Sequence, residues 1–236
     1  MPAALVDEIP SVVLAIFAHP DDAEVAAGGT LARWASNGSE VYVCVCALGD
    51  KGSLDPSTAP EVLVELRKDE SVEAGKILGL KGRYWLGYPD GEIENSVALR
   101  AQMVGLIRKL KPEVVLAPDP TAVFFGKTYV NHRDHRGVGW AVVDSVCPAA
   151  SSPHYFPEEG PAHSVSKLLL AGTLEPDVWV DIGVSIETKA AAVVCHKSQI
   201  GERRDLVAAS VRRRASDAGQ RAGTRFAESF REVVLW

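Results

Sequence analysis

Residues 18–24 bring together side chains that can bind a metal ion and accept a proton. The segment reads AHPDDAE and follows a short apolar run. His19 and Asp22 offer a nitrogen and an oxygen ligand suited to Zn²⁺, and Pro20 stiffens the turn between them. Asp21 would then point elsewhere and be free to act as a base. In a purely structural role, Asp21 or Asp22 would cap a following helix, but capping explains one acid and not the whole group.

Residues 131–135, which read NHRDH, form a second group of this kind. They follow a loop and open a predicted helix, so Asn131 is expected as the N-cap with Asp134 at the third helical position. The two histidines, His132 and His135, lie three residues apart and share a face if the turn is helical. One of them could bind a metal while the other forms a hydrogen bond with a reacting group.

Together the two segments supply the ligands of a catalytic zinc site. Such a site usually has three protein ligands and an open position for water or substrate. His19, Asp22 and one of the two later histidines would give two nitrogen ligands and one carboxylate oxygen. The residues themselves do not decide between His132 and His135.

The elements that must position these segments follow a βαβ pattern. Short apolar runs rich in β-branched residues predict strands buried on both faces, and amphipathic stretches between them predict helices. The predicted strands are 12–17, 41–46, 83–86 and 113–117, and the predicted helices are 28–37, 61–78 and 96–110. This alternation favours a parallel sheet covered by helices. Ligands bind at the carboxyl ends of such strands, and residues 18–24 directly follow the first one.

The pattern loosens after residue 118. A loop at 118–129 and an irregular stretch at 149–164 interrupt it. The remaining predicted elements are helices at 134–146, 185–196 and 201–221 and strands at 167–170, 178–180 and 231–236. No change in composition marks a linker, and no internal repeat is present. We therefore predict a single domain over residues 1–236, an α/β, Rossmann-like three-layer fold with a mainly parallel sheet and an elaborated C-terminal third.

Composition and charge exclude several classes of protein. The chain has 236 residues, of which 47% are hydrophobic and 24% charged, which is typical of a globular protein rather than a disordered or fibrous one. The net charge of −6 argues against binding to nucleic acid or an anionic membrane. The longest apolar runs are too short to span a bilayer, and the first residues do not resemble a signal peptide, so a cytoplasmic location is expected. The four cysteines form no C-x-x-C pair and are expected to be structural thiols.

The motifs of this chain resemble those of the PIG-L/LmbE family of zinc-dependent N-deacetylases. The resemblance rests on AHPDD at 18–22 with two glycines shortly after, on LGYPDG at 86–91, and on NHRDH at 131–135. An HKSQ segment at 196–199 is also similar to one common in that family. The motifs occur in the family's order and span residues 12–199, so the resemblance covers most of the chain.

The resemblance implies a metal site and a base. His19, Asp22 and His135 would bind one zinc ion per chain. Asp21 would be the general base that takes a proton from the attacking water, a step that typically contributes about 10²–10⁴-fold to the rate.

The resemblance also implies roles for four further residues. A cationic His132 would stabilise the oxyanion and protonate the leaving amine, and Asp134 would orient His132 or tune its charge. Arg67 and Asp90 match positions that contact the sugar in family members.

The implied activity is hydrolysis of the N-acyl, above all N-acetyl, group of an N-acetylglucosamine-type amino sugar or its conjugate. One alternative is an amidase or deacylase acting on a thiol-sugar conjugate or a natural-product intermediate. A second, from another class, is a non-catalytic Rossmann-like ligand-binding protein, although acids in the first turn would repel a pyrophosphate. The loops 49–60, 118–129 and 149–164 would select the substrate. Family members are often oligomeric, so the resemblance also implies a homo-oligomer.

Several other charged residues are open to two interpretations. Seven arginines lie between residues 203 and 225, where interspersed acids such as Glu228 predict a solvated helix held by ion pairs; the alternative is contact with an anionic ligand or a subunit. His154 and His163 are expected at the surface, unless their loop covers the site. His196 is expected at the end of a helix, where a cation is favourable, and the resemblance places its segment near the active site.

Overall fold

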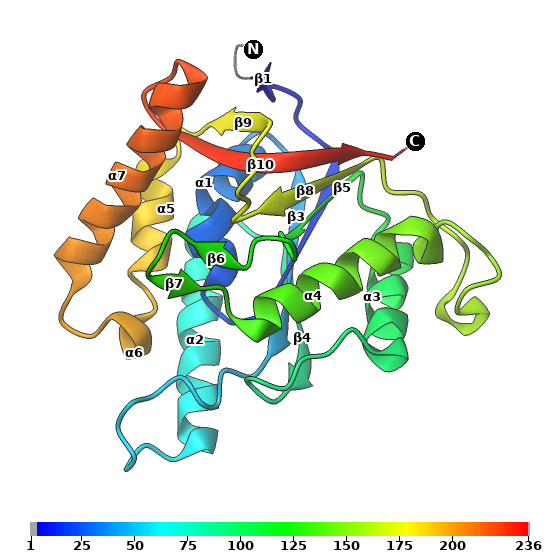
Figure 1. The fold of residues 1–236 in the computed structure, drawn as a ribbon, viewed down its shortest axis with the longest axis horizontal. Helices are drawn as coiled ribbons and strands as arrows, with labels where there is room; N and C mark the ends of the chain where they lie inside the picture. Colours follow the sequence, from blue (N-terminus) through cyan, green and yellow to red (C-terminus); the bar gives the residue numbers. More distant parts are fainter. Residues whose placement is uncertain (1–3, 236) are drawn as a thin grey trace.

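An eight-stranded sheet forms the centre of the computed structural model, which describes residues 4–235 (Figure 1). Its strand order is β1-β9-β10-β8-β5-β2-β3-β4. The strands are β1 (Ala4–Leu5), β2 (Val12–Phe17), β3 (Glu40–Ala47), β4 (Gly82–Tyr88), β5 (Val114–Pro118), β8 (Lys167–Ala171), β9 (Val178–Asp181) and β10 (Ala227–Val234), and a separate hairpin joins β6 (Phe124–Phe125) to β7 (Tyr129–Val130). The run from β8 to β4 is parallel, whereas β10 is antiparallel to both neighbours. The predicted α/β fold with a mainly parallel sheet is confirmed.

Helices cover both faces of this sheet. They are α1 (Asp22–Ser36), α2 (Pro60–Leu78), α3 (Val97–Leu110), α4 (Arg133–Asp144), η1 (Ser145–Ala150), η2 (Pro157–Glu159), α5 (Ile186–Val193), α6 (Lys197–Ile200) and α7 (Arg204–Ala222). Side chains of β2 alternate between two cores: Val13 and Phe17 pack with α1, α5 and α7, whereas Leu14 and Ile16 pack with α3 and α4. The fold therefore has three layers. Within residues 4–235, none of the helices is both long and apolar enough to cross a bilayer.

Two predicted boundaries in the C-terminal third are wrong. The helix expected at 185–196 ends at Val193 as α5, and the separate short helix α6 begins only after His196, whose backbone (φ −78°, ψ 60°) is not helical. The last strand begins at Ala227 instead of residue 231, because its first residues pair with β9, with Ala227 opposite Asp181. A partner strand distant in sequence supplies that pairing. The predicted end of this strand, Trp236, lies outside the described residues.

The arginines of the C-terminal stretch do not form the ion pairs that the sequence predicts. Among the described residues, only Arg212 of the seven has a carboxylate within ion-pair distance, that of Glu187 at 2.5 Å. Glu228 is buried and pairs instead with Lys189. The outer face of α7 is therefore a solvated row of positive charge.

A buried arginine fixes the irregular stretch that follows η1. Arg108 is 2% exposed and donates from Nε, Nη1 and Nη2 to six backbone carbonyls between Ala149 and Gly160. Nearby, Nε2 of His163 lies 2.8 Å from the carbonyl of Pro112, which precedes β5. This anchors the predicted substrate loop at the amino edge of the sheet, opposite to the carboxyl ends of the parallel strands (Figure 1).

Replacing Arg108 tests this anchor. We expect Arg108→Lys to lower the free energy of unfolding by about 2–4 kcal/mol, because an ammonium offers three donors to six buried carbonyls. Urea unfolding measures the change. The reverse exchange at the exposed neighbour, Lys109→Arg, should stay within about 0.5 kcal/mol of the native protein. Equal stability of the Arg108 and Lys109 variants would show that the six contacts do not hold the loop.

Candidate metal centre and active site

Three side chains from three elements form a triangle at the carboxyl end of β2. His19 lies in the turn after β2, Asp22 begins α1, and His135 lies in the first turn of α4. Nδ1 of His19 is 3.2 Å from Nε2 of His135 and 3.3 Å from Oδ2 of Asp22. The third edge, from Nε2 of His135 to Oδ2 of Asp22, is 3.2 Å. Two nitrogen ligands and one carboxylate oxygen are thus almost equidistant.

The edges of this triangle fit a tetrahedral zinc ion. With metal–ligand distances of about 2.0–2.1 Å, neighbouring ligand atoms of a tetrahedron lie about 3.3–3.4 Å apart. The observed edges of 3.2 and 3.3 Å are close to that value. Three corners of a tetrahedron leave the fourth for water or substrate. Of the two histidines that the sequence left as alternatives, the structure brings His135 to this triangle.

The charges around the triangle favour a cation at its centre. Burial lowers the pKa of His19, but the carboxylates of Asp134, Asp22 and Asp90 outweigh burial and raise it to about 12. Burial likewise lowers the pKa of His135, but the carboxylate of Asp22 has the opposite and larger effect, so the pKa is raised overall. Burial raises the pKa of Asp22, yet the two histidines hold it well below its usual range. Protons on imidazoles balance the carboxylates here, and a divalent cation would supply the same balance.

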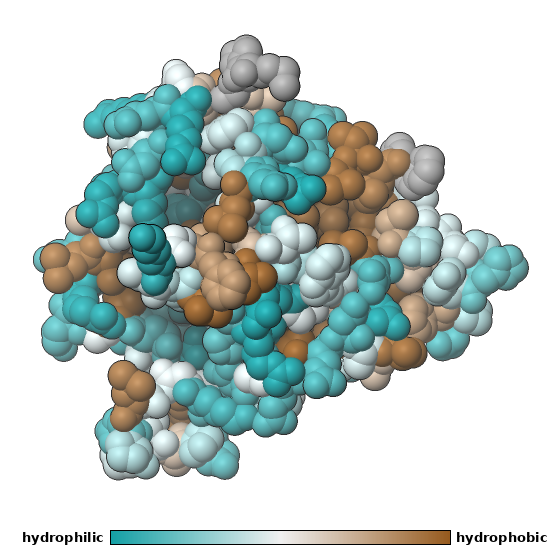
Figure 2. All heavy atoms as spheres, in the orientation of Figure 1, coloured by the Kyte–Doolittle hydropathy of each residue, from teal (hydrophilic) through white to brown (hydrophobic). Residues whose placement is uncertain are grey.

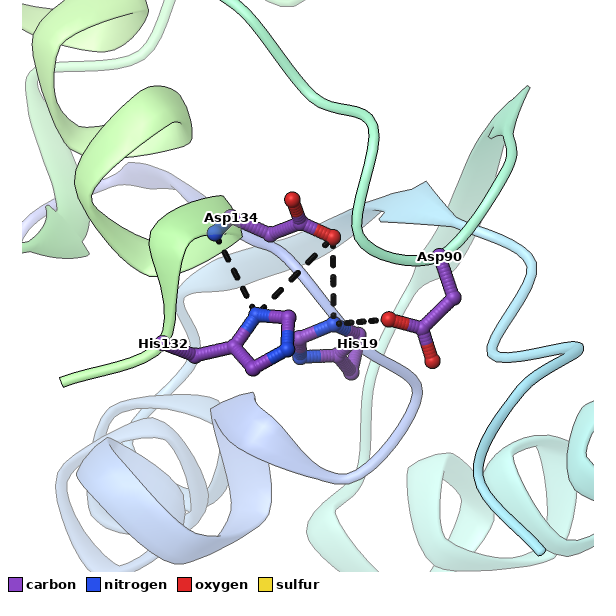
Figure 3. A group of neighbouring side chains, drawn as sticks. All are labelled: His19, Asp90, His132 and Asp134. Carbon is purple, nitrogen blue, oxygen red and sulfur yellow. Dashed lines mark hydrogen bonds and ion pairs between the residues drawn. The ribbon is translucent and has the colours of Figure 1, made fainter. Parts of the chain in front are cut away.

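The second nitrogen of His19 faces two carboxylates (Figure 3). Nε2 of His19 lies 3.2 Å from Oδ1 of Asp90 and 3.5 Å from Oδ2 of Asp134. A carboxylate on the outer nitrogen of a metal-binding histidine fixes the ring and raises its basicity. The sequence gave Asp90 a sugar contact and gave Asp134 a role toward His132. It did not indicate that both acids orient His19, since no local pattern links positions this far apart.

Asp134 is held rigidly by backbone donors. Its carboxylate accepts hydrogen bonds from the N–H groups of Gly91 (2.6 Å) and Ile93 (3.2 Å), and the residue is fully buried. Burial raises the pKa of Asp134, but His19 and these two N–H groups lower it below its usual value. The turn after β4 is thereby tied to the start of α4, which places Asp90 beside His19.

The N-cap of α4 is His132, not Asn131 as predicted. Nδ1 of His132 accepts the N–H of Asp134 at 3.2 Å. Asn131 instead supports the metal triangle, because its Oδ1 lies 2.9 Å from Nδ1 of His135 while its amide donates to the carbonyl of Ala122. Nδ1–H of His135 therefore donates to Oδ1 of Asn131, which leaves Nε2 free to bind a metal.

His132 is a neutral donor in this arrangement. Burial and the nearby His19 lower the pKa of His132. With Nδ1 accepting the N–H of Asp134, the single ring proton resides on Nε2. The side chain is 42% exposed, so it remains accessible to solvent and substrate. The sequence analysis expected a cation here, whereas the structure favours a neutral imidazole that donates through Nε2.

Asp21 lies at the N-cap position of α1 but forms no capping hydrogen bond. Its Oδ1 accepts from Nη2 of Arg67 at 3.0 Å, so capping does not explain this acid. Arg67 is 3% exposed and also donates to the carbonyl of Gly49. Burial and repulsion by Asp22 raise the pKa of Asp21 in spite of Arg67 and His196. A carboxyl group with a raised pKa beside the triangle is suited to accept a proton.

One face of α2 holds the loops around the site, a feature that the sequence analysis missed. Glu70 and Ser71 follow Arg67 by three and four positions, so the three share a helix face. The hydroxyl of Ser71 donates to the carbonyl of Pro20 at 2.9 Å. The carboxylate of Glu70 accepts from the N–H and hydroxyl of Ser198 at 2.8 and 2.7 Å. The helix thereby joins the HPDD turn to the HKSQ segment.

A second buried group lies beneath Asp21. Glu24 is fully buried and pairs with Nη2 of Arg83 at 2.6 Å and with Nε2 of His196 at 3.7 Å. Burial raises the pKa of Glu24, but Arg83 and His196 lower it below its usual value. The predicted proximity of the HKSQ segment to the site thus has a physical basis in the contact of His196 with Glu24, which lies in the first turn of α1 together with Asp22.

Comparisons with known proteins agree with this geometry. The profile of the PIG-L family, described as GlcNAc-PI de-N-acetylase, matches residues 14–146. The diacetylchitobiose deacetylase of Thermococcus kodakarensis is 31% identical over 226 residues, which cover 94% of this chain and 82% of that protein. The 1D-myo-inositol 2-acetamido-2-deoxy-alpha-D-glucopyranoside deacetylase of Rhodococcus jostii is 30% identical over 245 residues, covering 80% of this chain and 81% of that protein. The solved N,N'-diacetylchitobiose deacetylase of Pyrococcus horikoshii has a TM-score of 0.87 and 31% identity, over 95% of this chain and 84% of that one.

Removing one corner of the triangle tests metal binding. We expect His135→Ala to bind zinc at least ~100-fold more weakly, beyond the ~10–100-fold that loss of an outer-sphere partner costs. Elemental analysis after zinc loading and desalting measures the metal per chain. His163→Ala, at the opposite edge of the sheet, should retain the native content. Stoichiometric zinc in the His135 variant would exclude this histidine as a ligand.

Proposed function

This chain belongs to the PIG-L family, and on that basis we propose that it is a zinc-dependent hydrolase that removes the N-acyl group of an N-acetylglucosamine-type amino sugar or its conjugate. The observation that carries the proposal is the equilateral triangle of His19, Asp22 and His135 with the carboxyl group of Asp21 beside it. A binding protein would gain nothing from burying an acid next to a metal site, whereas a hydrolase needs one.

His19, Asp22 and His135 would hold one zinc ion. When bound, zinc supplies a Lewis acid that lowers the pKa of water and polarises an amide carbonyl. Asp90 and Asp134 fix the ring of His19 through Nε2, and Asn131 fixes that of His135 through Nδ1. These outer contacts keep the ligating nitrogens aimed at one point before the metal arrives.

Asp21 is the proposed base, and its two oxygens have different surroundings. Oδ1 accepts from Arg67, which leaves Oδ2 to take the proton of the attacking water. The water oxygen bonds to the amide carbonyl carbon, the carbon–nitrogen bond breaks, and the proton on Asp21 passes to the amine nitrogen. The products are a carboxylic acid, which then releases its remaining proton to the solvent, and the free amino sugar. Arg67 acts here by holding Asp21 in place.

His132 completes the arrangement as an electrophile. Its Nε2–H donates to the carbonyl oxygen as negative charge develops there, and the Nδ1 contact with Asp134 N–H fixes the ring for that task. A neutral donor suffices, so the amine receives its proton from Asp21. Sugar contacts through Arg67 and Asp90 stay predictions, because the structure occupies both side chains with internal partners.

Removal of the metal tests the proposed function. Dipicolinate treatment should abolish release of free amine from N-acetylglucosamine and N,N'-diacetylchitobiose, and stoichiometric Zn²⁺ should restore it. Mg²⁺ should not, because it prefers six oxygen ligands to two imidazoles and one carboxylate. Amine release that survives complete chelation would contradict a metal-dependent reaction. Absence of release by the zinc-loaded protein from either sugar would contradict a deacetylase with these substrates.

The base is tested separately from the metal. Asp21→Asn should keep the native zinc content and lose about 10²–10⁴-fold in kcat, because the amide cannot take a proton from water. Elemental analysis and amine release measure the two effects on the same sample. Asp217→Asn, an exposed acid on α7, is the matched control and should leave both unchanged. Native turnover by the Asp21 variant would assign the proton transfer to another residue.

A further inference from the structure

A cavity of about 830 Å³ opens beside the metal triangle. Two of the triangle's residues, Asp22 and His135, line it. Asn131, which orients His135, lines it as well, whereas Asp21, His132 and Asp90 do not. The cavity thus meets the site at Asp22 and His135, and neither the base nor the oxyanion donor forms part of its wall.

Much of the cavity wall comes from α7, α1 and the β6–β7 hairpin. One face of α7 forms a stripe at helical spacing that includes Ser210, Ala215 and Ala218, whose small side chains leave the space empty. The N-terminal turns of α1 face this stripe with Val25, which is 42% exposed. The hairpin of β6 and β7 contributes the ring of Tyr129. Figure 2 shows the hollow between the hydrophilic column of α7 and the hydrophobic side chains at the hairpin.

The interior of the cavity offers little to a charged group. Lys189 and Glu228, at its floor, neutralise each other, and Glu228 also accepts the N–H groups of Gly29 and Thr30. Arg214 is exposed and therefore lies at the opening. Apart from the metal ligands, the rest of the lining is aliphatic, aromatic or uncharged. Such a surface gains free energy by burying hydrocarbon and gives no partner to an ionised group.

We propose that this cavity receives the hydrocarbon chain of the acyl group, so that the substrates are amino sugars carrying N-acyl chains longer than acetyl. An amide held at the metal has its sugar on one side and its acyl carbon on the other. Asp21, which passes its proton to the amine nitrogen, lies outside the cavity lining, so we place the nitrogen and its sugar toward Asp21 and the acyl carbon toward Asp22, His135 and the cavity. A volume of about 830 Å³ is in the range of sites for whole drug-sized ligands and far exceeds a methyl group. The inference rests on the proposed function, since it extends the same hydrolysis to products that are a longer carboxylate and the free amino sugar.

A series of N-acylglucosamines with acetyl, butyryl, hexanoyl and octanoyl chains tests this inference on the zinc-loaded protein. We expect kcat/KM to rise with chain length, by at least ~10-fold from acetyl to octanoyl, because each added methylene buries apolar surface in the cavity. Ser210→Trp fills the cavity from α7 and should lower kcat/KM for octanoyl at least ~10-fold more than for acetyl. Ala218→Phe, two turns further along α7, serves the same purpose if the first variant is unstable. Ala209→Trp, on the exposed face of the same helix, should leave the native chain-length profile intact.

Three results would overturn the inference. Equal kcat/KM for all four acyl chains would show that the cavity does not take the chain. A chain-length gain that survives both cavity-filling variants would place the chain elsewhere. A gain with octyl N-acetylglucosaminide, and none with N-octanoylglucosamine, would make the cavity a site for the aglycone. Hydrolysis of the acetyl substrate in each of these cases would leave the proposed function standing, whereas no hydrolysis of any substrate would refute that function as well.

Discussion

The crowding of three carboxylates around one imidazole is the constraint on which the site depends. Asp22 faces one nitrogen of His19, and Asp90 and Asp134 face the other. Each acid comes from a different element, and each is largely withdrawn from water. Buried negative charges of this kind are stable only with cations and hydrogen-bond donors beside them. The geometry therefore requires a positive charge at the triangle and explains why the backbone N–H groups of the turn after β4 are directed at Asp134.

Helix α2 holds the loops that carry the site. Its buried face carries Arg67, Glu70 and Ser71, which hold the base, the HKSQ segment and the HPDD turn respectively. Three contacts from one rigid helix fix two loops that are distant in sequence, so the loops cannot shift independently. No residue of α2 lines the cavity, which is bordered by α1, α7 and the β6–β7 hairpin.

The positions of the charged residues say more about the function of this protein than its net charge does. The acids that matter gather at the carboxyl ends of the parallel strands, while among the described arginines of α7 only Arg212 forms an ion pair. Helix α7 buries only Ala215 and Gly219, so its inner face borders a space instead of filling a core. A helix with such a small buried surface is held mainly through its neighbours β10 and α5, and its small inner side chains determine what that space can accommodate.

The sequence by itself determined the layered α/β fold, the order of its elements and the types of ligand available, because hydrophobic periodicity and short motifs are local properties. It also placed the HPDD turn at a strand end, where parallel sheets bind ligands. Only the tertiary structure decided which histidine joins His19 and Asp22, that Asp90 turns toward His19, and that Arg67 holds Asp21. It also moved the cap of α4 from Asn131 to His132, ended the helix expected at 185–196 at Val193 and opened the cavity beside α7. These outcomes depend on contacts between residues far apart in the chain, and such contacts are set by how helices and strands pack, which no local pattern encodes.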